Sequence, residues 1–250
     1  NSIILTSGLG INDKMIDFLP QANVVKMEFT FLGGDAETHD AFTRNPGSYD
    51  KLFNILKVLH KRGINCIAKM IITDDNKHQV KLLKKQLEQL GIRFTFDPHI
   101  WRPYDGIEDD VQKFRISQDD MKEFYRWQSG NYVEVNNDIH MCVAGRNKVG
   151  ITPEGLVNPC GMYGTKFVFG SLQENSFTEI WNNSEELLQF LNKTSQEYPI
   201  KKCITCENRI YCDWCPGLSA WCNENIYEPY EELCKDTELK RLVADKVDCN

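Results

Sequence analysis

Short apolar runs alternate with helical patterns over the first hundred residues of the chain. Strands are predicted at 3–5, 24–31, 64–72 and 92–96. Helices are predicted between these strands, at 11–19, from Ser48 to Gly63 and from Asn76 to Gly91. Strands and helices that alternate in this way predict right-handed crossovers and a parallel sheet.

Four strands are too few to close a barrel of this kind. The sequence therefore allows either an open sheet or a barrel whose earlier strands are missing. The chain begins at Asn1, without Met and directly before an apolar run. We therefore expect a fragment whose beginning lies elsewhere.

The hydrophobic pattern changes in the second half of the chain. A connector is expected at 101–116 and a helix at 117–128. Two strand-like runs around Pro153-Glu154-Gly155 predict a hairpin over 149–157. A capping box, Ser176 with Glu179, predicts one helix that continues through Leu191.

The composition limits the kinds of partner. The 250 residues are 41% hydrophobic and carry a formal net charge of -7, which argues against nucleic acid as a partner. No apolar run approaches the roughly 18–20 residues that a spanning helix needs, so no membrane segment is expected.

Cysteine is the outstanding residue type, with ten copies. Eight of them fall in the second half: Cys142, Cys160, Cys203, Cys206, Cys212, Cys215, Cys222 and Cys234. Cys66, inside a predicted strand, is expected to be a small core residue, and Cys249 to be free. A disulfide scaffold is the alternative, but such scaffolds are mostly small secreted domains. Metal binding is the better interpretation.

The spacing of these cysteines favours shared metal centres. Folding of the hairpin brings Cys142 and Cys160 together, because paired strands lie about 5 Å apart. Further on, two Cys-x2-Cys steps are separated by five residues, a pattern used for both zinc and iron–sulfur ligation. A zinc ribbon is the nearest competitor, and zinc would make the region purely structural.

The chain resembles a known family at these residues. Cys142-x12-Gly155-x4-Cys160, followed by Cys-x2-Cys-x5-Cys-x2-Cys and a last Cys234, is similar to the SPASM domain of radical S-adenosylmethionine (radical SAM) enzymes that modify peptides and proteins. Phe169-Gly170-Ser171-Leu172, leading to Phe177–Trp181, supports this. In the first half, residues 29–33, 37–40 and 46–49 resemble the middle strands of the radical SAM barrel.

The resemblance implies a fold, a domain order and a set of ligands. The fold class is α/β: a partial parallel (β/α) radical SAM barrel at 1–110, a bridging helix and linker at 111–140, and a small SPASM domain with a β-hairpin and helices at 141–250. Two auxiliary [4Fe–4S] clusters are implied. The first would be bound by Cys142, Cys160 and Cys215, and the second by Cys203, Cys206, Cys212 and Cys234. The fourth ligand of the first cluster stays open: either Cys222 fills the place or it is left for substrate.

Three departures from the family pattern affect the expected activity. The family's Cys-x3-Cys-x2-Cys motif, which binds the cluster that cleaves S-adenosylmethionine, is absent, so the fragment alone is expected to be inactive. The spacing from Cys212 to Cys215 is x2, where many SPASM domains have x3. Sulfatase-maturing members place an Asp after the cysteine that corresponds to Cys160, where this chain has Gly161.

The resemblance also implies three residues near S-adenosylmethionine. Thr30 keeps the hydroxyl of a family Ser, although it could simply pack at a strand end. Lys69 could reach the cofactor's carboxylate or extend from an outer strand face to solvent. Asn76 occupies a family Asn position, and capping the following helix is its other expected role. No catalytic residue is assigned.

The leading hypothesis is a radical SAM oxidoreductase that matures a peptide, for example through thioether or other side-chain crosslinks. The implied partners are a peptide or protein substrate and an electron donor such as flavodoxin or ferredoxin, in a cytoplasmic, low-oxygen setting. The alternatives are a sulfatase-maturase-like enzyme, which Gly161 disfavours, a zinc-stabilised binding module, and an electron-transfer module that works beside a catalytic chain.

Overall fold

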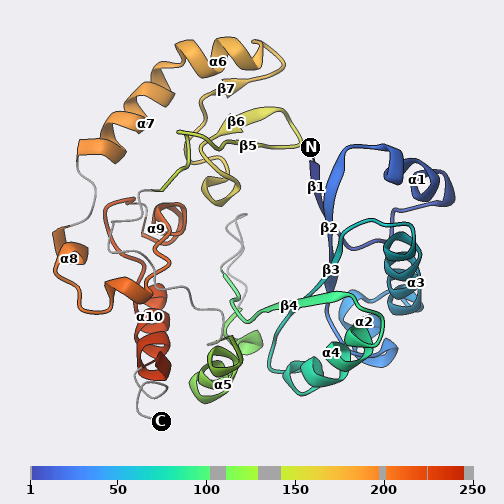
Figure 1. Cartoon of the computed structure of the whole chain (residues 1–250). Coiled ribbons are helices and arrows are strands. Elements are labelled where there is room, and N and C mark those ends of the chain that lie inside the picture. Colours follow the sequence, from blue (N-terminus) through green and yellow to red (C-terminus); the bar gives the residue numbers. More distant parts are fainter. Residues whose placement is uncertain (1, 102–110, 129–141, 197–200, 224, 245–250) are drawn as a thin grey trace. The chain divides into compact units, whose positions relative to one another are not determined.

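The computed structural model describes residues 2–101, 111–128, 142–196, 201–223 and 225–244 (Figure 1). The chain forms two compact units. Unit 1 comprises residues 1–101 and 109–121, and unit 2 comprises residues 102–108 and 122–250. The helix α5 (Gln118–Gln128) crosses the division, so part of the predicted bridging helix belongs to each unit.

Unit 1 contains a parallel sheet of four strands in the order β1-β2-β3-β4. The strands are β1 (Ser2–Thr6), β2 (Val24–Phe31), β3 (Cys66–Ile71) and β4 (Arg93–Asp97). Each neighbouring pair is parallel, so the connection between successive strands must cross back over the sheet. The predicted strand sites, parallel sheet and α/β class are confirmed.

The crossovers of unit 1 contain the helices. The α-helices are α1 (Asp13–Phe18), α2 (Ala36–Thr43), α3 (Ser48–Lys61) and α4 (Val80–Glu88). Short 3-10 turns lie at η1 (Leu19–Gln21), η2 (Lys77–Gln79) and η3 (Val111–Phe114). Helix α2 is not evident from the hydrophobic pattern, because its only fully buried residue is His39. The Asp35 side chain caps it by accepting a hydrogen bond from the Thr38 amide.

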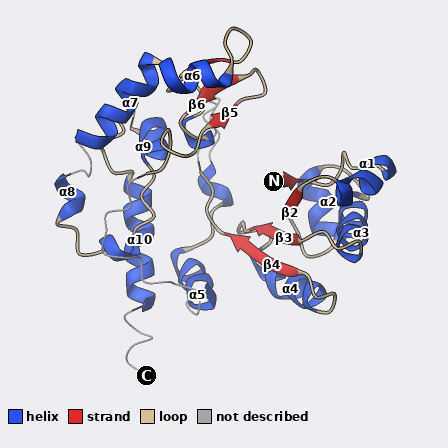
Figure 2. Cartoon of the chain, turned by 45° about the horizontal axis from the view of Figure 1, so that its top comes forward, coloured by secondary structure: helices blue, strands red, loops and turns tan. Residues whose placement is uncertain are grey.

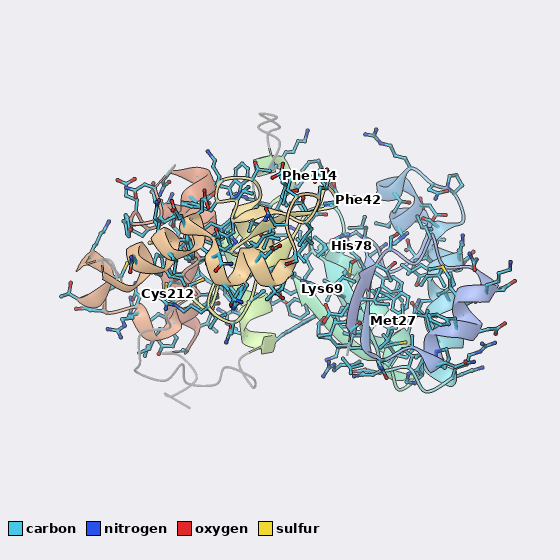
Figure 3. The ribbon with its side chains drawn as sticks, turned by 90° about the horizontal axis from the view of Figure 1, so that it is seen from above. Met27, Phe42, Lys69, His78, Phe114 and Cys212 are labelled. Carbon is cyan, nitrogen blue, oxygen red and sulfur yellow. The ribbon has the colours of Figure 1, made fainter. Side chains whose placement is uncertain are left out.

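The sheet of unit 1 has two different faces. Met27, Phe29 and Phe31 alternate along β2 and are buried on the face covered by helices α3 and α4. Thr30 points to the opposite face, and its register partner on β3 is Lys69. Figure 3 labels Met27 and Lys69, which lie on neighbouring strands and opposite faces. Thr30 and Lys69 therefore share the face of the sheet opposite α3 and α4.

Unit 2 contains a small antiparallel sheet in the order β5-β6-β7. Strands β5 (Gly150–Ile151) and β6 (Leu156–Asn158) form the predicted hairpin, with Ile151 opposite Val157. Strand β7 (Gly170–Ser171) then pairs with β6. Only two residues long, β7 is too short to show a pattern of its own, and it was not predicted as a strand.

Helices make up most of the rest of unit 2 (Figure 2). They are α6 (Phe177–Asn183), α7 (Glu185–Gln196), α8 (Lys201–Ile204), α9 (Pro216–Cys222) and α10 (Glu231–Ala244), with 3-10 turns η5 (Gly161–Tyr163) and η6 (Arg209–Tyr211). The capping box of Ser176 with Glu179 is present. The single helix expected through Leu191 is wrong, however. Ser184 has extended backbone angles, and its hydroxyl accepts from the Leu187 amide, which ends α6 and begins α7.

One hydrophobic core holds the cysteine-rich half of unit 2 together. Its buried residues come from the hairpin, η5, α6, α7, α9 and the connecting loops, and they include Val157, Tyr163 and Phe190. Cys142 and Cys160 pack against this core. None of the helices in the described ranges has the length and apolar character that crossing a bilayer requires.

Candidate metal centre

None of the nine cysteines within the described ranges forms a disulfide. Cys249 lies outside these ranges. Among the described residues, no three His, Cys, Asp or Glu side chains converge closely enough to hold a single metal ion. The thiols do act on one another electrostatically, however, and these interactions place seven of them in two groups.

The first cysteine group consists of Cys142, Cys160 and Cys215. Burial is the main reason that the pKa of Cys142 and of Cys215 is raised. Negative charge on Cys160 adds to the shift at Cys142, and charge on both adds to the shift at Cys215. The pKa of Tyr163 is raised by burial and then by charge on all three thiols. Residues that lie up to 73 positions apart in the sequence are therefore neighbours in the fold.

Local structure explains how these three thiols are positioned. Cys160 follows β6 and precedes the 3-10 turn η5, whose Tyr163 amide donates to the Cys160 carbonyl at 2.9 Å. Cys142 stands just before the bridge that joins Ala144 to Lys148. Cys215 is the N-cap of α9, and Pro216 at the first helical position favours the start of the helix there.

The environment of the first cysteine group is largely desolvated, as the effect of burial on Cys142 and Cys215 shows. Hydrogen bonds from the Gly217 and Leu218 amides at the start of α9 oppose this effect at Cys215, because they stabilise the thiolate. A metal centre would offset the burial cost by holding the sulfurs as thiolates.

The second cysteine group consists of Cys203, Cys206, Cys212 and Cys234. Burial raises the pKa of Cys203 to about 11, and negative charge on the other three members adds to the shift. Charge on Cys212 and Cys206 also raises the pKa of Cys234, after the larger effect of burial. The group combines a short segment around η6 with helix α10, which lies farther along the chain.

Helix α10 supplies one member of the second group, Cys234, and two buried residues on the same side of the helix. Cys234, Thr237 and Lys240 recur every three residues, close to the helical repeat, and Thr237 and Lys240 are buried. Burial raises the pKa of Cys212, whereas hydrogen bonds with Thr237 and the Trp214 amide lower it. Helix α10 was not predicted from the sequence, because Asp236 and Lys240 occupy buried positions that a helical hydrophobic pattern would fill with apolar residues.

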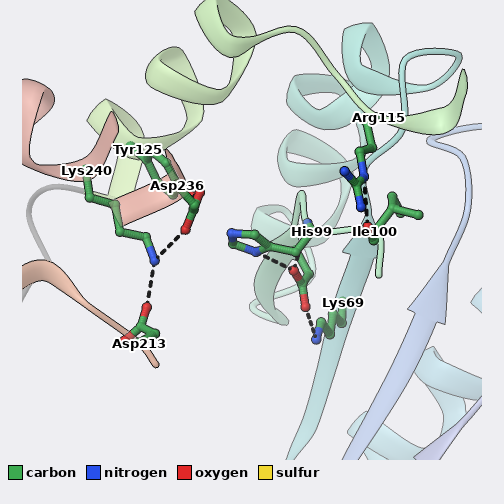
Figure 4. Close-up of polar contacts among 9 residues, drawn as sticks. Lys69, His99, Ile100, Arg115, Tyr125, Asp213, Asp236 and Lys240 are labelled. Atoms are coloured by element: carbon green, nitrogen blue, oxygen red, sulfur yellow. Dashed lines mark hydrogen bonds and ion pairs between the residues drawn. The ribbon is translucent and has the colours of Figure 1, made fainter. Parts of the chain in front are cut away.

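The buried Lys240 connects α10 to the cysteine loop through an ion pair with Asp213, whose side chain is 70% exposed. The Lys240 ammonium lies 2.6 Å from an Asp213 carboxylate oxygen and 3.0 Å from an Asp236 carboxylate oxygen (Figure 4). Tyr125 of α5 donates its hydroxyl hydrogen bond to Asp236. The Lys240 side chain is only 5% exposed, so its charge depends on these carboxylates. Asp213 follows Cys212 directly, so the ion pair fixes the loop that carries both Cys212 and Cys215.

The two remaining described cysteines occupy different settings. Cys222 is the last residue of α9, seven positions after Cys215, which is about 10 Å along a helix. Its assignment as a metal ligand stays a prediction. Cys66 is 3% exposed in β3, where burial raises its pKa to about 11. It lies in unit 1, as expected of a core residue.

Two of the candidate cofactor residues of unit 1 are register partners. Thr30 and Lys69 lie on adjacent strands and on the face without helices. Lys69 forms an ion pair of 2.9 Å with Asp97, which also accepts from the His99 amide at 3.1 Å. The pKa of Asp97 is lowered: burial acts to raise it, but contacts with His99 and Lys69 outweigh burial. An anionic ligand of Lys69 would have to share it with Asp97.

Asn76, the third candidate cofactor residue, forms hydrogen bonds to main-chain groups within unit 1. It is fully buried, and its amide nitrogen donates to the Leu32 carbonyl at 3.0 Å and to the Ile71 carbonyl at 2.9 Å. Its oxygen accepts from the Thr73 amide at 2.8 Å. Asn76 therefore ties together the chain after β2 and after β3. The predicted side-chain cap is wrong, because η2 has no side-chain hydrogen bond from Asn76 to its first turn. Its role as a cofactor ligand stays a prediction.

The comparison with known families decides the identity of the cysteine-rich region. Residues 142–207 match the SPASM family, an iron–sulfur cluster-binding domain. This match contains the hairpin, Cys142, Cys160 and the first Cys-x2-Cys step. Residues 142–207 are therefore a SPASM domain, and the chain as a whole is similar to radical SAM/SPASM proteins.

Curated relatives of this SPASM protein include enzymes with different substrates. It is 24% identical to an AdoMet-dependent heme synthase of Nitratidesulfovibrio vulgaris, a match that covers 85% of this chain and 65% of the relative. It is 23% identical to the antilisterial bacteriocin subtilosin biosynthesis protein AlbA of Bacillus subtilis, covering 84% of this chain and 48% of AlbA. The chain therefore spans 48% to 65% of the length of these relatives.

Solved structures show the same fold. Native anSMEcpe with bound AdoMet has a TM-score of 0.65 at 14% identity, with 98% of this chain and 72% of that chain covered. SuiB of Streptococcus suis has a TM-score of 0.60 at 15% identity, with 88% of this chain and 54% of that chain covered. The fold class predicted from the sequence is confirmed.

The residues of the SPASM domain fit iron–sulfur ligation by their chemistry. Each cysteine group supplies soft thiolate donors, the usual ligands of iron–sulfur clusters, and burial raises the pKa of members of both groups, although Cys206 and Cys234 are exposed. Sequence reasoning overlooked Tyr163, Asp213, Thr237 and Lys240. A signal existed for two of them, since Asp213 lies inside a Cys-x2-Cys step and Tyr163 follows Cys160 by three positions.

Proposed function

We propose that this chain is the C-terminal portion of a radical SAM enzyme that modifies a peptide, with one auxiliary [4Fe–4S] cluster bound by each cysteine group. The main support is the division of seven thiols into the sets Cys142, Cys160, Cys215 and Cys203, Cys206, Cys212, Cys234. The SPASM match supports iron–sulfur binding in this region.

The residues of unit 2 would bind the clusters and exclude water from them. When bound, such clusters supply one-electron transfer. The hydrophobic core behind Cys142 and Cys160 limits solvent access on that side. The Gly217 and Leu218 amides favour a thiolate at Cys215, and Thr237 does so at Cys212. The first cluster has three ligands in this proposal, with either Cys222 or a substrate group as the fourth.

The residues of unit 1 would contribute to the S-adenosylmethionine site. Thr30 offers a hydroxyl and Lys69 an ammonium on the same face of the sheet. The cluster that cleaves S-adenosylmethionine would be bound by a segment outside this chain, so the chain alone is proposed to be inactive. An electron donor such as flavodoxin or ferredoxin would serve the intact enzyme in a low-oxygen cytoplasm.

A peptide substrate is favoured by three of the similar proteins. AlbA is named for subtilosin biosynthesis, anSMEcpe has been solved with the Kp18Cys peptide, and SuiB with its precursor peptide SuiA. We propose the class of bond that is formed, a thioether or another side-chain crosslink, and not one specific bond.

A second candidate is the modification of a tetrapyrrole. It is favoured by relatives named AdoMet-dependent heme synthase in three organisms and by a pre-heme d1 synthase. The two candidates share the clusters and differ in the substrate. The intact enzyme, reduced without oxygen and supplied with S-adenosylmethionine, can be offered precursor peptides encoded beside its gene and, separately, tetrapyrrole precursors of heme. A mass change in the peptide supports the first candidate, and a mass change in the tetrapyrrole supports the second.

Metal analysis tests the cluster assignment directly. The chain, purified or reconstituted without oxygen, is expected to hold iron and acid-labile sulfide in equal amounts, at about eight of each per chain. Cys66→Ala is the matched control, because this cysteine is buried in unit 1, and it should retain the full iron content. Cys222→Ala shows whether this residue is the fourth ligand. Zinc without sulfide would contradict the proposal and favour the structural zinc module.

A further inference from the structure

The Tyr163 side chain combines complete burial with an unused hydroxyl. Tyr163 is 1% exposed, and its hydroxyl has no hydrogen-bond partner among the described residues. Its ring packs edge-on against Phe167 and Phe190, with centroids 5.5 Å and 5.4 Å away. Phenylalanine would fill this position without burying a polar atom. A buried hydroxyl of this kind normally has a partner, but no described protein atom forms a hydrogen bond of ordinary geometry with the Tyr163 hydroxyl.

The surroundings of the hydroxyl identify that partner. Tyr163 belongs to the same core against which Cys142 and Cys160 pack, and its amide is bonded to the Cys160 carbonyl. On the other side, the turn η5 packs against α9, which begins just after Cys215. Charges on Cys142, Cys215 and Cys160 all act on the phenol. The hydroxyl thus lies beside the place where the three sulfurs of the first cysteine group would meet a cluster.

Its position relative to Cys142 favours hydrogen bonding over ligation. The hydroxyl and the Cys142 sulfur are close enough to affect each other, without forming a bond of ordinary geometry in the metal-free chain. A fourth ligand would bind a different iron from Cys142 and so would not adjoin its sulfur. A hydroxyl beside a ligating sulfur is instead placed to donate its proton to it.

We propose that Tyr163 donates a hydrogen bond to the sulfur of the first auxiliary cluster, either at Cys142 or at a neighbouring sulfide, and thereby raises its reduction potential. Hydrogen bonds to cluster sulfurs stabilise the more negative, reduced state, and this is one of the main determinants of cluster potential. The inference rests on the proposed function, because it requires a cluster at Cys142, Cys160 and Cys215. Tyr163 is then a positioning and tuning residue.

The test compares Tyr163→Phe with the unmutated chain after iron–sulfur clusters have been assembled in both without oxygen. A Cys212→Ala background removes the second cluster, so that the first can be titrated alone by electron paramagnetic resonance. We expect Tyr163→Phe to retain its iron and sulfide and to shift the midpoint potential of the first cluster to a more negative value. Tyr227→Phe is the matched control, since its hydroxyl is also buried and its ring packs on the same core, and it should leave this potential unchanged.

A second measurement detects the hydrogen bond itself. Electron–nuclear double resonance of the reduced unmutated protein should detect a proton coupled to the first cluster that exchanges in D2O and is absent from Tyr163→Phe. Absence of this proton overturns the inference, and so does an unchanged midpoint potential in Tyr163→Phe that contains its clusters. Either result leaves the proposed function standing. A phenolate-to-iron charge-transfer band also overturns it, because Tyr163 would then be a ligand. Absence of iron and sulfide from the unmutated protein overturns both this inference and the proposed function.

Discussion

Cys212 and Cys215 are separated by only two residues, yet they belong to different cysteine groups. Cys212 interacts with Cys203, Cys206 and Cys234, whereas Cys215 interacts with Cys142 and Cys160. Both residues have extended backbone angles, and side chains of extended residues diverge. In a zinc ribbon the two cysteines of such a step converge on one ion. The loop from 212 to 215 instead joins the two candidate centres.

Single substitutions at the two ends of this loop should therefore remove different clusters. Cys212→Ala is expected to lose the cluster of the second group and to retain the first, whereas Cys215→Ala should do the reverse. Iron and sulfide content, at about half the full value in each variant, together with the electron paramagnetic resonance signal that survives, checks this. Loss of the same signal in both variants would show that the two cysteines share one centre.

The buried ion pair of Lys240 should be important for the stability of unit 2. Lys240→Met leaves Asp236, which is 7% exposed, without this cation, and the loss of one partner of a buried pair costs about 3–5 kcal/mol. We expect a decrease of that size in the free energy of unfolding, measured by urea denaturation without oxygen.

The matched control lies on the same helix. Lys235 pairs with Glu231 at 3.0 Å, but both side chains are largely exposed. Lys235→Met should therefore change the free energy of unfolding far less than Lys240→Met does, because solvent screens an exposed pair. An equal effect of the two substitutions would mean that the burial of Lys240 is unimportant.

Asn76 should act in unit 1 as a structural residue, whatever its contact with a cofactor. Asn76→Ala removes three hydrogen bonds to main-chain groups, and buried polar groups left without partners cost about 1–3 kcal/mol each. We expect a loss of at least about 2 kcal/mol in the free energy of unfolding. Asn54→Ala, at an exposed position of α3, should change it by less than about 0.5 kcal/mol. A stable Asn76→Ala that binds S-adenosylmethionine more weakly would instead favour a direct role.

Asp97 should make stability depend on pH in the acid range. Burial acts to raise its pKa in the folded chain, but contacts with His99 and Lys69 outweigh burial and lower it. A carboxylate whose pKa is lowered by folding stabilises the fold at pH values above its unfolded pKa of about 3.9. This contribution is lost as the pH falls from there through the folded pKa. The stability difference between the unmutated chain and Asp97→Asn should therefore be constant above about pH 5 and shrink below about pH 4. Urea denaturation of the metal-free chain over this range measures it, and a difference that grows on acidification contradicts the assignment.

The sequence was sufficient for elements whose pattern is local. The four strands of unit 1 follow from their apolar runs, and the hairpin of β5 and β6 follows from its turn residues. The sequence did not predict elements whose buried faces carry polar residues, such as α2 and α10. Their helical positions are occupied by His39 and Lys240, which are buried only because distant residues provide hydrogen bonds and counter-charges.

By itself the sequence determined the number and spacing of the thiols, the parallel order of the first strands and the resemblance to SPASM domains. It could not decide from spacing alone which thiols are neighbours, because loop closure between segments such as 142–160 and 215 depends on the packing of a shared core. Only the tertiary structure separated Cys212 from Cys215, buried Lys240 against Asp213 and Asp236, and left the Tyr163 hydroxyl facing three thiols. The physical reason is that burial and charge pairing are properties of residues brought together by folding, whereas spacing is a property of the chain.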